Sequence, residues 1–164
     1  MRSMIERTVA GLLVILFTAT VLAVCWQVIG RYVLAAPSSA TEEIARFLLI
    51  WLGMLSMVYA FIMRMHVGVD LVSARISASS HKTLARLIWL LCALFAIAVL
   101  IYGGGRLVSI TATLGQTSPS LGMPMWAIYT ILPISGIIVT FYSLAFLREG
   151  ALQDAGNPEE MIND

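Results

Sequence analysis

Residues 38–70 read SSATEEIARFLLIWLGMLSMVYAFIMRMHVGVD, and this stretch decides the fold. Near its start are three charged residues, Glu42, Glu43 and Arg46. The stretch is then apolar over 47–63 and ends in a second polar cluster. An apolar run of this length predicts a helix that crosses a membrane. Ionisable groups are costly in lipid, so the two polar clusters indicate contacts with partners or with other parts of the chain.

The composition of the whole chain is that of an integral membrane protein. Of its 164 residues, 60% are hydrophobic and 12% are charged, and the mean hydropathy is +0.92. A soluble domain is about 45–50% apolar and about 25% charged. A spanning helix needs about 20 mostly apolar residues. Four stretches meet this requirement, at about 9–30, 44–63, 84–103 and 125–147.

We therefore predict an all-α integral membrane protein, with one four-helix membrane domain over 1–147 and an acidic tail over 148–164. The apolar run that starts at Val9 is too long for the core of a signal peptide, so we expect it to remain as a helix.

Charge predicts the orientation of the chain. Most basic residues fall on one side of the predicted spans: Arg2, Arg7, Arg64, Arg75, Lys82, Arg86 and Arg148. The opposite side, called outer below, has Arg31, Arg46 and Arg106. Because cytoplasmic loops carry the excess of Lys and Arg, both termini, the tail and the central loop are predicted to be cytoplasmic.

A polar clasp is predicted at the outer end of the second span. Glu42 and Glu43 lie in the first turn of this helix, and Arg46 lies one turn further on, within reach of either carboxylate. Arg31, at the outer end of the first span, is expected to face the same side, and Trp51 is grouped with these residues. Two interpretations stay open and are compatible. One is an internal salt-bridged clasp between spans, and the other is a polar contact with a second protein.

A second polar cluster is predicted at the cytoplasmic interface, around His66 and Asp70. Over residues 69–76, apolar residues recur at helical spacing with polar residues opposite them. This pattern predicts a short amphipathic helix that lies in the interface between spans two and three.

The second outer loop, residues 115–124, contains two prolines and two glycines and is predicted to be rigid and non-helical. Its candidate contact residues for a protein on the outer side of the membrane are Ser118, Pro119, Ser120, Pro124 and Trp126. Before this loop, the glycines at 103–105 predict a bend or a close helix crossing. Residues 107–114 are expected either to continue the helix or to lie on the outer surface. Pro133 predicts a kink in span four.

Chemistry within the chain is not expected. Cys25 and Cys92 lie inside predicted spans and no C-x-x-C motif is present, which disfavours thiol redox chemistry. The two histidines lie outside the apolar cores, where they cannot ligate a membrane haem. The sequence offers no nucleophile–base pair or metal cluster. We expect no enzyme activity, no cofactor, no bound metal and no nucleic-acid partner.

In order along the chain, these features resemble the small membrane subunit, DctQ-like, of tripartite ATP-independent periplasmic (TRAP) transporters. The resemblance covers about residues 5–147 and rests on four groups of residues in register with the spans. These are Arg31-Tyr32, then Glu42-Glu43-Ile44-Ala45-Arg46 with Trp51-Leu52-Gly53, then His66 with Val69-Asp70, and finally the run from Ser118 to Trp126 with Tyr129 and Pro133. Ala40-Thr41 departs from the tryptophan often found there in the family.

The resemblance implies a location and partners. Such a subunit lies in the bacterial inner membrane and pairs with a large, DctM-like membrane subunit that carries substrate and sodium. A periplasmic binding protein delivers an organic acid, such as a C4-dicarboxylate or sialic acid. The small subunit is implied to act as a scaffold and to widen the docking surface for the binding protein.

One alternative stays open at this point. The chain would instead form a small oligomeric channel or exporter, with a wet axis lined by Gln27, Ser56 or Ser109. No acidic residue lies deep in a predicted span, which disfavours an ion relay within the chain itself.

Overall fold

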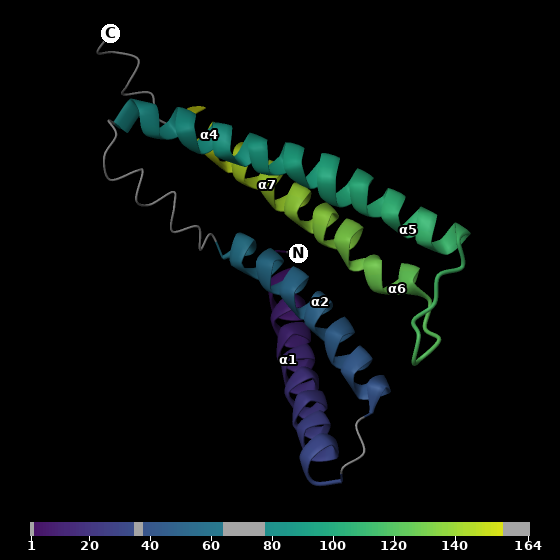
Figure 1. Ribbon diagram of the computed structural model, residues 1–164. Coiled ribbons are helices and arrows are strands. Elements are labelled where there is room, and N and C mark those ends of the chain that lie inside the picture. Colours follow the sequence, from purple (N-terminus) through teal and green to yellow (C-terminus); the bar gives the residue numbers. More distant parts are fainter. Residues whose placement is uncertain (1, 35–37, 64–77, 156–164) are drawn as a thin grey trace.

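The computed structural model describes residues 2–34, 38–63 and 78–155 (Figure 1). The helices are α1 (Arg2–Tyr32), α2 (Ser39–Ile62), α4 (Ala78–Phe95), the π-helix η1 (Ala96–Gly103), α5 (Gly104–Thr113), α6 (Met125–Tyr129) and α7 (Ile131–Ala155). Four helical stretches are long and apolar enough to cross a membrane: Met4–Tyr32, Ser39–Ile62, Arg86–Thr113 and Met125–Arg148. The prediction of an all-α protein with four spans is confirmed.

The helices form two pairs. α1 packs along α2, and the long helix made of α4, η1 and α5 packs along α6 and α7 (Figure 1). Contacts between α2 and α7 join the pairs. The C-terminal end of α1, the N-terminal end of α2 and loop 114–124 lie at the same end of the molecule (Figure 1). It is the end that the charge pattern predicts to be periplasmic.

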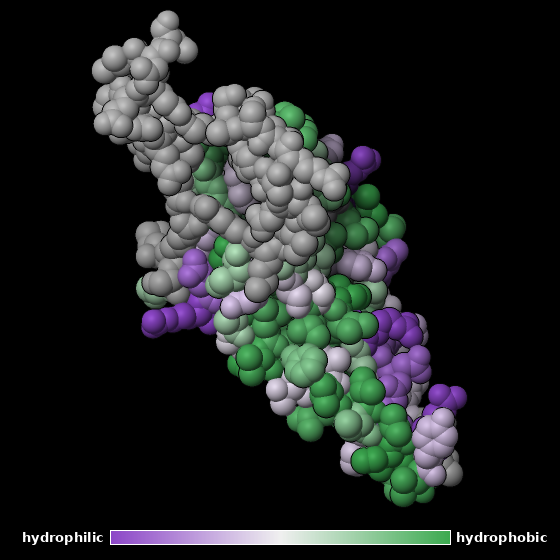
Figure 2. Space-filling view, turned by 90° about the vertical axis from the view of Figure 1, so that its left-hand side faces the viewer, coloured by the Kyte–Doolittle hydropathy of each residue, from purple (hydrophilic) through white to green (hydrophobic). Residues whose placement is uncertain are grey.

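A hydrophobic core forms where α2, η1 and α7 meet. Its buried residues are Val58, Phe61, Ile62, Ala96, Leu100, Val139, Tyr142 and Phe146. Trp89 of α4 packs edge-on against Phe61, with ring centroids 5.6 Å apart. α1 is peripheral: 6% of its most apolar window is buried, against 39% for the span that contains α7. Figure 2 shows hydrophobic side chains over much of the described part of one face, as expected for a surface that meets lipid or another membrane protein.

Two glycines set the close approach of α7 to the long helix. A Cβ atom added at Gly104 would lie 2.8 Å from Cβ of Leu132, and one added at Gly136 would lie 2.7 Å from Cβ of Leu100. Both distances are shorter than carbon–carbon contact allows. The sequence had suggested a bend or a close crossing at 103–105, and the structure shows a close crossing at Gly104.

The third span is longer than expected. The predicted end was residue 103, but the helix continues through α5 to Thr113. The glycines do not end the helix, because the backbone across them stays helical and Gly104 packs against α7. Of the two arrangements left open for residues 107–114, the structure shows continuation of the helix.

The fourth span is interrupted near its start. α6 ends at Tyr129, Thr130 forms a turn, and α7 begins at Ile131. Pro133 has no amide hydrogen, so it cannot donate to the carbonyl of Tyr129 as a helix would require. The expected distortion therefore falls one turn before the proline. α7 then continues to Ala155, beyond the predicted span end at 147.

Three predictions concern residues outside the described ranges. They are the amphipathic helix at 69–76, the interface residues His66 and Asp70, and the end of the tail at 156–164.

Candidate functional site

Glu43 of α2 anchors the loop between α5 and α6. Its side chain is 7% exposed. Carboxylate oxygen Oε2 accepts hydrogen bonds from Oγ of Ser118 at 2.9 Å, from the amide of Ser120 at 3.1 Å and from the amide of Leu121 at 3.0 Å. A buried carboxylate with three donors is well satisfied, and such charge-assisted bonds are stronger than neutral ones. Glu43 thereby fixes the loop to α2.

The loop closes on itself as well. The amide of Ser118 donates to the carbonyl of Met123 at 2.8 Å, and the amide of Gly122 donates to the carbonyl of Ser118 at 3.0 Å. Gly122 has a φ of +65°, a left-handed conformation that favours glycine. The amides of Ser120 and Leu121 are therefore presented together toward Glu43.

Trp51 makes a second contact between the helix pairs. Its indole Nε1 donates to the carbonyl of Ile128 in α6 at 3.1 Å. Beside it lies an apolar cavity of about 260 Å³, lined by Leu16, Phe47, Leu48, Trp51, Met123, Ala127 and Ile128. Trp51 had been grouped with the polar clasp, and the structure places it deeper, against the helix that follows the loop.

Glu42 and Arg46 form the exposed part of the site. Oε1 of Glu42 lies 3.2 Å from Nη2 of Arg46, one turn along the helix, with 60% of the Glu42 side chain and 65% of the Arg46 side chain exposed. An exposed pair of this kind contributes about 0–1 kcal/mol to stability. The sequence left either carboxylate as a partner for Arg46. In the structure Glu42 pairs with Arg46, and Glu43 binds the loop.

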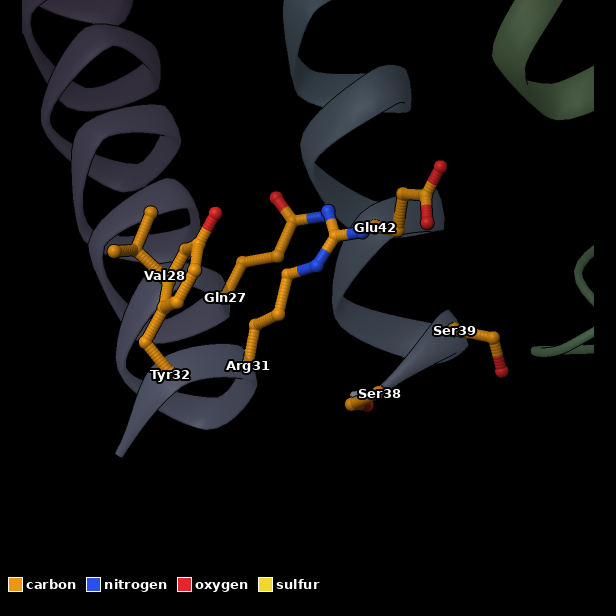
Figure 3. Close-up of a pocket in the computed structure, with 7 residues that line it drawn as sticks. All are labelled: Gln27, Val28, Arg31, Tyr32, Ser38, Ser39 and Glu42. Atoms are coloured by element: carbon orange, nitrogen blue, oxygen red, sulfur yellow. The ribbon is translucent and has the colours of Figure 1, made fainter. Parts of the chain in front are cut away.

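Arg31 lies in a groove between the ends of α1 and α2. The groove has a volume of about 550 Å³ and is lined by Gln27, Val28, Arg31, Tyr32, Ser38, Ser39 and Glu42. Figure 3 shows Arg31 and Gln27 extending from α1 toward α2, where Glu42 lies. Within the described residues Arg31 forms no ion pair, so an unpaired cation lines the groove together with the carboxylate of Glu42.

The structure brings together two sets of residues that the sequence kept apart. Glu43 had been assigned to the clasp, and Ser118 and Ser120 to a separate loop contact. The contact between Glu43 and the loop was not predicted, because residues about 75 positions apart show no common pattern in one sequence. Two further loop candidates lie after the residues that bind Glu43. Pro124 directly precedes α6, and Trp126, in α6, is 42% exposed.

Comparison with known proteins gives the family. Residues 20–153 match the family described as tripartite ATP-independent periplasmic transporters, DctQ component. The chain is 32% identical over 129 residues to the isethionate TRAP transporter permease protein DctMQ of Oleidesulfovibrio alaskensis, covering 77% of this chain and 20% of that protein.

Two further relatives carry small-permease names. The chain is 26% identical over 126 residues to the C4-dicarboxylate TRAP transporter small permease protein DctQ of Rhodobacter capsulatus, covering 68% of this chain and 50% of the relative. It is 29% identical over 117 residues to a putative TRAP transporter small permease protein of Haemophilus influenzae, covering 70% of this chain and 69% of the relative.

The chain thus spans a fifth of the first of these proteins and half of the second. The match covers the C-terminal part of α1 and the later helices up to residue 153, including α2 with Glu43 and the loop that Glu43 binds. The family is a component of a transporter permease, so the expectation that the chain is not an enzyme is confirmed. The chain belongs to the DctQ component family of tripartite ATP-independent periplasmic transporters.

Proposed function

We propose that this chain is a scaffold subunit that does not itself carry substrate. In this proposal it supports a large, DctM-like membrane subunit of a sodium-coupled TRAP transporter for an organic acid. It lies in the bacterial inner membrane with both termini cytoplasmic, as the charge bias predicts. Among its relatives, the fused name DctMQ fits a pairing with a large subunit, and the names isethionate and C4-dicarboxylate fit an organic acid substrate.

One observation carries the proposal: in the described residues, ionisable acids lie only near helix ends. Glu6 is in the first turns of α1, Glu42 and Glu43 begin α2, and Glu149 and Asp154 are in the last turns of α7. Ion and proton pathways through membrane proteins use acids placed within spans. A chain whose described spans carry acids only near their ends is suited to support a conductor.

The anchored loop supports a docking role for the binding protein. Rigid loops bind partners at a lower entropic cost than mobile ones. The loop amides of Ser120 and Leu121 donate to Glu43 on the side that faces α2. Pro119, Met123 and Trp126 are exposed. These residues are uncharged, so we propose that they contribute apolar contacts to the periplasmic protein, beside the charged groove of Arg31, Glu42 and Arg46.

Transport assays test the proposal. Proteoliposomes containing this chain alone should show no organic acid uptake under a sodium gradient. Those that also contain a large, DctM-like subunit from the same genome and the binding protein should show uptake. Sodium-driven uptake by this chain alone would overturn the scaffold role, and so would full activity of the large subunit and binding protein without it.

A cross-linking experiment tests docking separately. A photoreactive residue at Ser120 should cross-link to the binding protein when both are mixed. One placed at Phe17, on the exposed apolar side of α1, is the control and should not. Equal cross-linking from both positions would contradict a docking role for the loop.

A further inference from the structure

Arg106 lies inside a helical stretch that is long and apolar enough to span a membrane, which its sequence position did not suggest. It is the third residue of α5, within the span Arg86–Thr113, and seven residues before the helix ends at Thr113. At a rise of about 1.5 Å per residue, this places its Cα about 10 Å from the helix end. Arg31, by contrast, is one residue from the end of α1, where water is within reach.

The side chain of Arg106 points away from its own chain. It is exposed, whereas Gly104, two residues earlier, is buried against Leu132 and Pro133 of α7. Two residues along a helix are separated by about 200° of rotation, so Arg106 lies opposite the packed face. Its guanidinium has no hydrogen bond or ion pair with any of the described residues. An arginine within a membrane span normally has an anionic or carbonyl partner.

Polar groups continue along the same face of the helix. Tyr102, Arg106, Ser109 and Thr113 recur every three or four residues and are all exposed. The hydroxyls of Ser109 and Thr113 donate to carbonyls of their own helix, at 2.9 and 2.8 Å, which lowers the cost of placing them in an apolar setting. We name these four residues the Arg106 stripe.

The exposed surface of α1 offers a contrast within the same molecule. Its large exposed residues between positions 12 and 24 are apolar, among them Val14, Phe17 and Leu22. Such a surface needs only lipid. The Arg106 stripe differs because polar residues within membrane spans face protein or water-filled cavities and rarely face lipid.

We propose that the Arg106 stripe is the contact surface for the large membrane subunit, and that Arg106 forms an ion pair with a carboxylate of that subunit. This rests on the proposed function. A protein partner fits better than a lipid phosphate because the stripe extends inward to Tyr102, one turn deeper than Arg106, beyond the depth of headgroups. The planar guanidinium matches a carboxylate with two parallel hydrogen bonds, which is specific in a dry interface.

Complex recovery tests the inference. The chain and a large, DctM-like subunit from the same genome are co-expressed, and the tagged small subunit is purified in mild detergent. Arg106→Leu and Arg106→Glu should lower recovery of the large subunit by at least about tenfold, the loss expected when one partner of a buried charge pair is removed. Arg106→Lys should retain more of the complex than Arg106→Leu.

Arg148→Leu is the matched control, because Arg148 is an exposed arginine at the far end of its span. It should leave recovery unchanged. The amount of each variant in the membrane and its thermal unfolding when expressed alone show whether it folds. A photoreactive residue at Tyr102 gives a second measurement, and it should cross-link to the large subunit.

The outcomes separate this inference from the proposed function. If the wild-type chain does not co-purify with the large subunit, the proposed function fails. If the wild-type chain and Arg106→Leu co-purify equally well and Tyr102 cross-links only to lipid, the function stands, but the stripe faces the bilayer and the inference is wrong. Reduced recovery of Arg106→Leu with normal folding, together with a cross-link from Tyr102, supports the inference.

Discussion

Glu42 and Glu43 are adjacent in the sequence, yet their environments differ completely. Glu43 is buried and accepts three hydrogen bonds from the loop, whereas Glu42 is exposed beside Arg46 and the groove that contains Arg31. Neighbouring positions on a helix point about 100° apart, so one carboxylate faces the other helix pair and its neighbour faces outward. The comparison indicates that Glu43 holds the fold together and that Glu42 remains available for a partner.

Replacing Glu43 should have the largest effect on stability. Glu43→Ala removes the acceptor of three hydrogen bonds and should lower the free energy of unfolding by about 2–4 kcal/mol. The measurement is unfolding in mixed detergent micelles, together with hydrogen exchange of the Ser120 and Leu121 amides. Glu42→Ala is the matched control and should change stability little. Equal losses for the two variants would remove the distinction between them.

Replacing Gly122 tests whether the loop conformation matters independently of Glu43. A side chain at a φ of +65° is strained, so Gly122→Ala should cost about 1–2 kcal/mol. The readout is the same unfolding experiment. Gly105→Ala is the control, because a Cβ atom there meets nothing within 4 Å and the backbone is helical. A loop that tolerates Gly122→Ala without loss is not held in the described conformation.

Trp51 tests the deeper contact between the helix pairs. Trp51→Phe keeps an aromatic ring but removes the hydrogen bond to the Ile128 carbonyl, and should cost about 0.5–1.5 kcal/mol. Indole fluorescence of the other tryptophans can follow unfolding in both proteins. A variant as stable as the wild type would show that this bond adds nothing to the joining of the pairs.

Arg46 should have the smallest effect on stability and a separate effect on function. Arg46→Ala removes an exposed pair worth about 0–1 kcal/mol, so unfolding should hardly change. If the charged groove contacts the partner proteins, complex recovery or uptake should fall, and the fall should be smaller at high salt, where surface charges are already screened. Unchanged recovery and uptake would remove the groove from the proposed docking surface.

Much of the architecture could be predicted from the sequence. Apolar runs of membrane length reveal the spans, because lipid requires long apolar helices with satisfied backbones. The end of the third span was misplaced, since glycines at 103–105 weaken an isolated helix and their close packing against α7 is invisible in the sequence. Pro133 was expected to kink its helix, and the structure shows the helix interrupted at Thr130, one turn before the proline. The missing amide is a property of the residue itself, so the sequence reveals it.

The candidate site was only partly predictable. Pairing of Glu42 with Arg46 depends on helical spacing, so it was among the predicted arrangements. The contact of Glu43 with Ser118, and the position of Arg106 inside a span, depend on which helices lie side by side. For the interface residues His66 and Asp70, the assignment stays a prediction.

The sequence by itself determined that this chain is a four-span membrane protein with few charges inside its apolar runs, because hydropathy and charge act residue by residue. Only the tertiary structure decided that Glu43 binds the loop and that Arg106 faces outward from the bundle. The reason is that a side chain's role depends on the neighbours that packing brings to it, and those neighbours are distant along the chain.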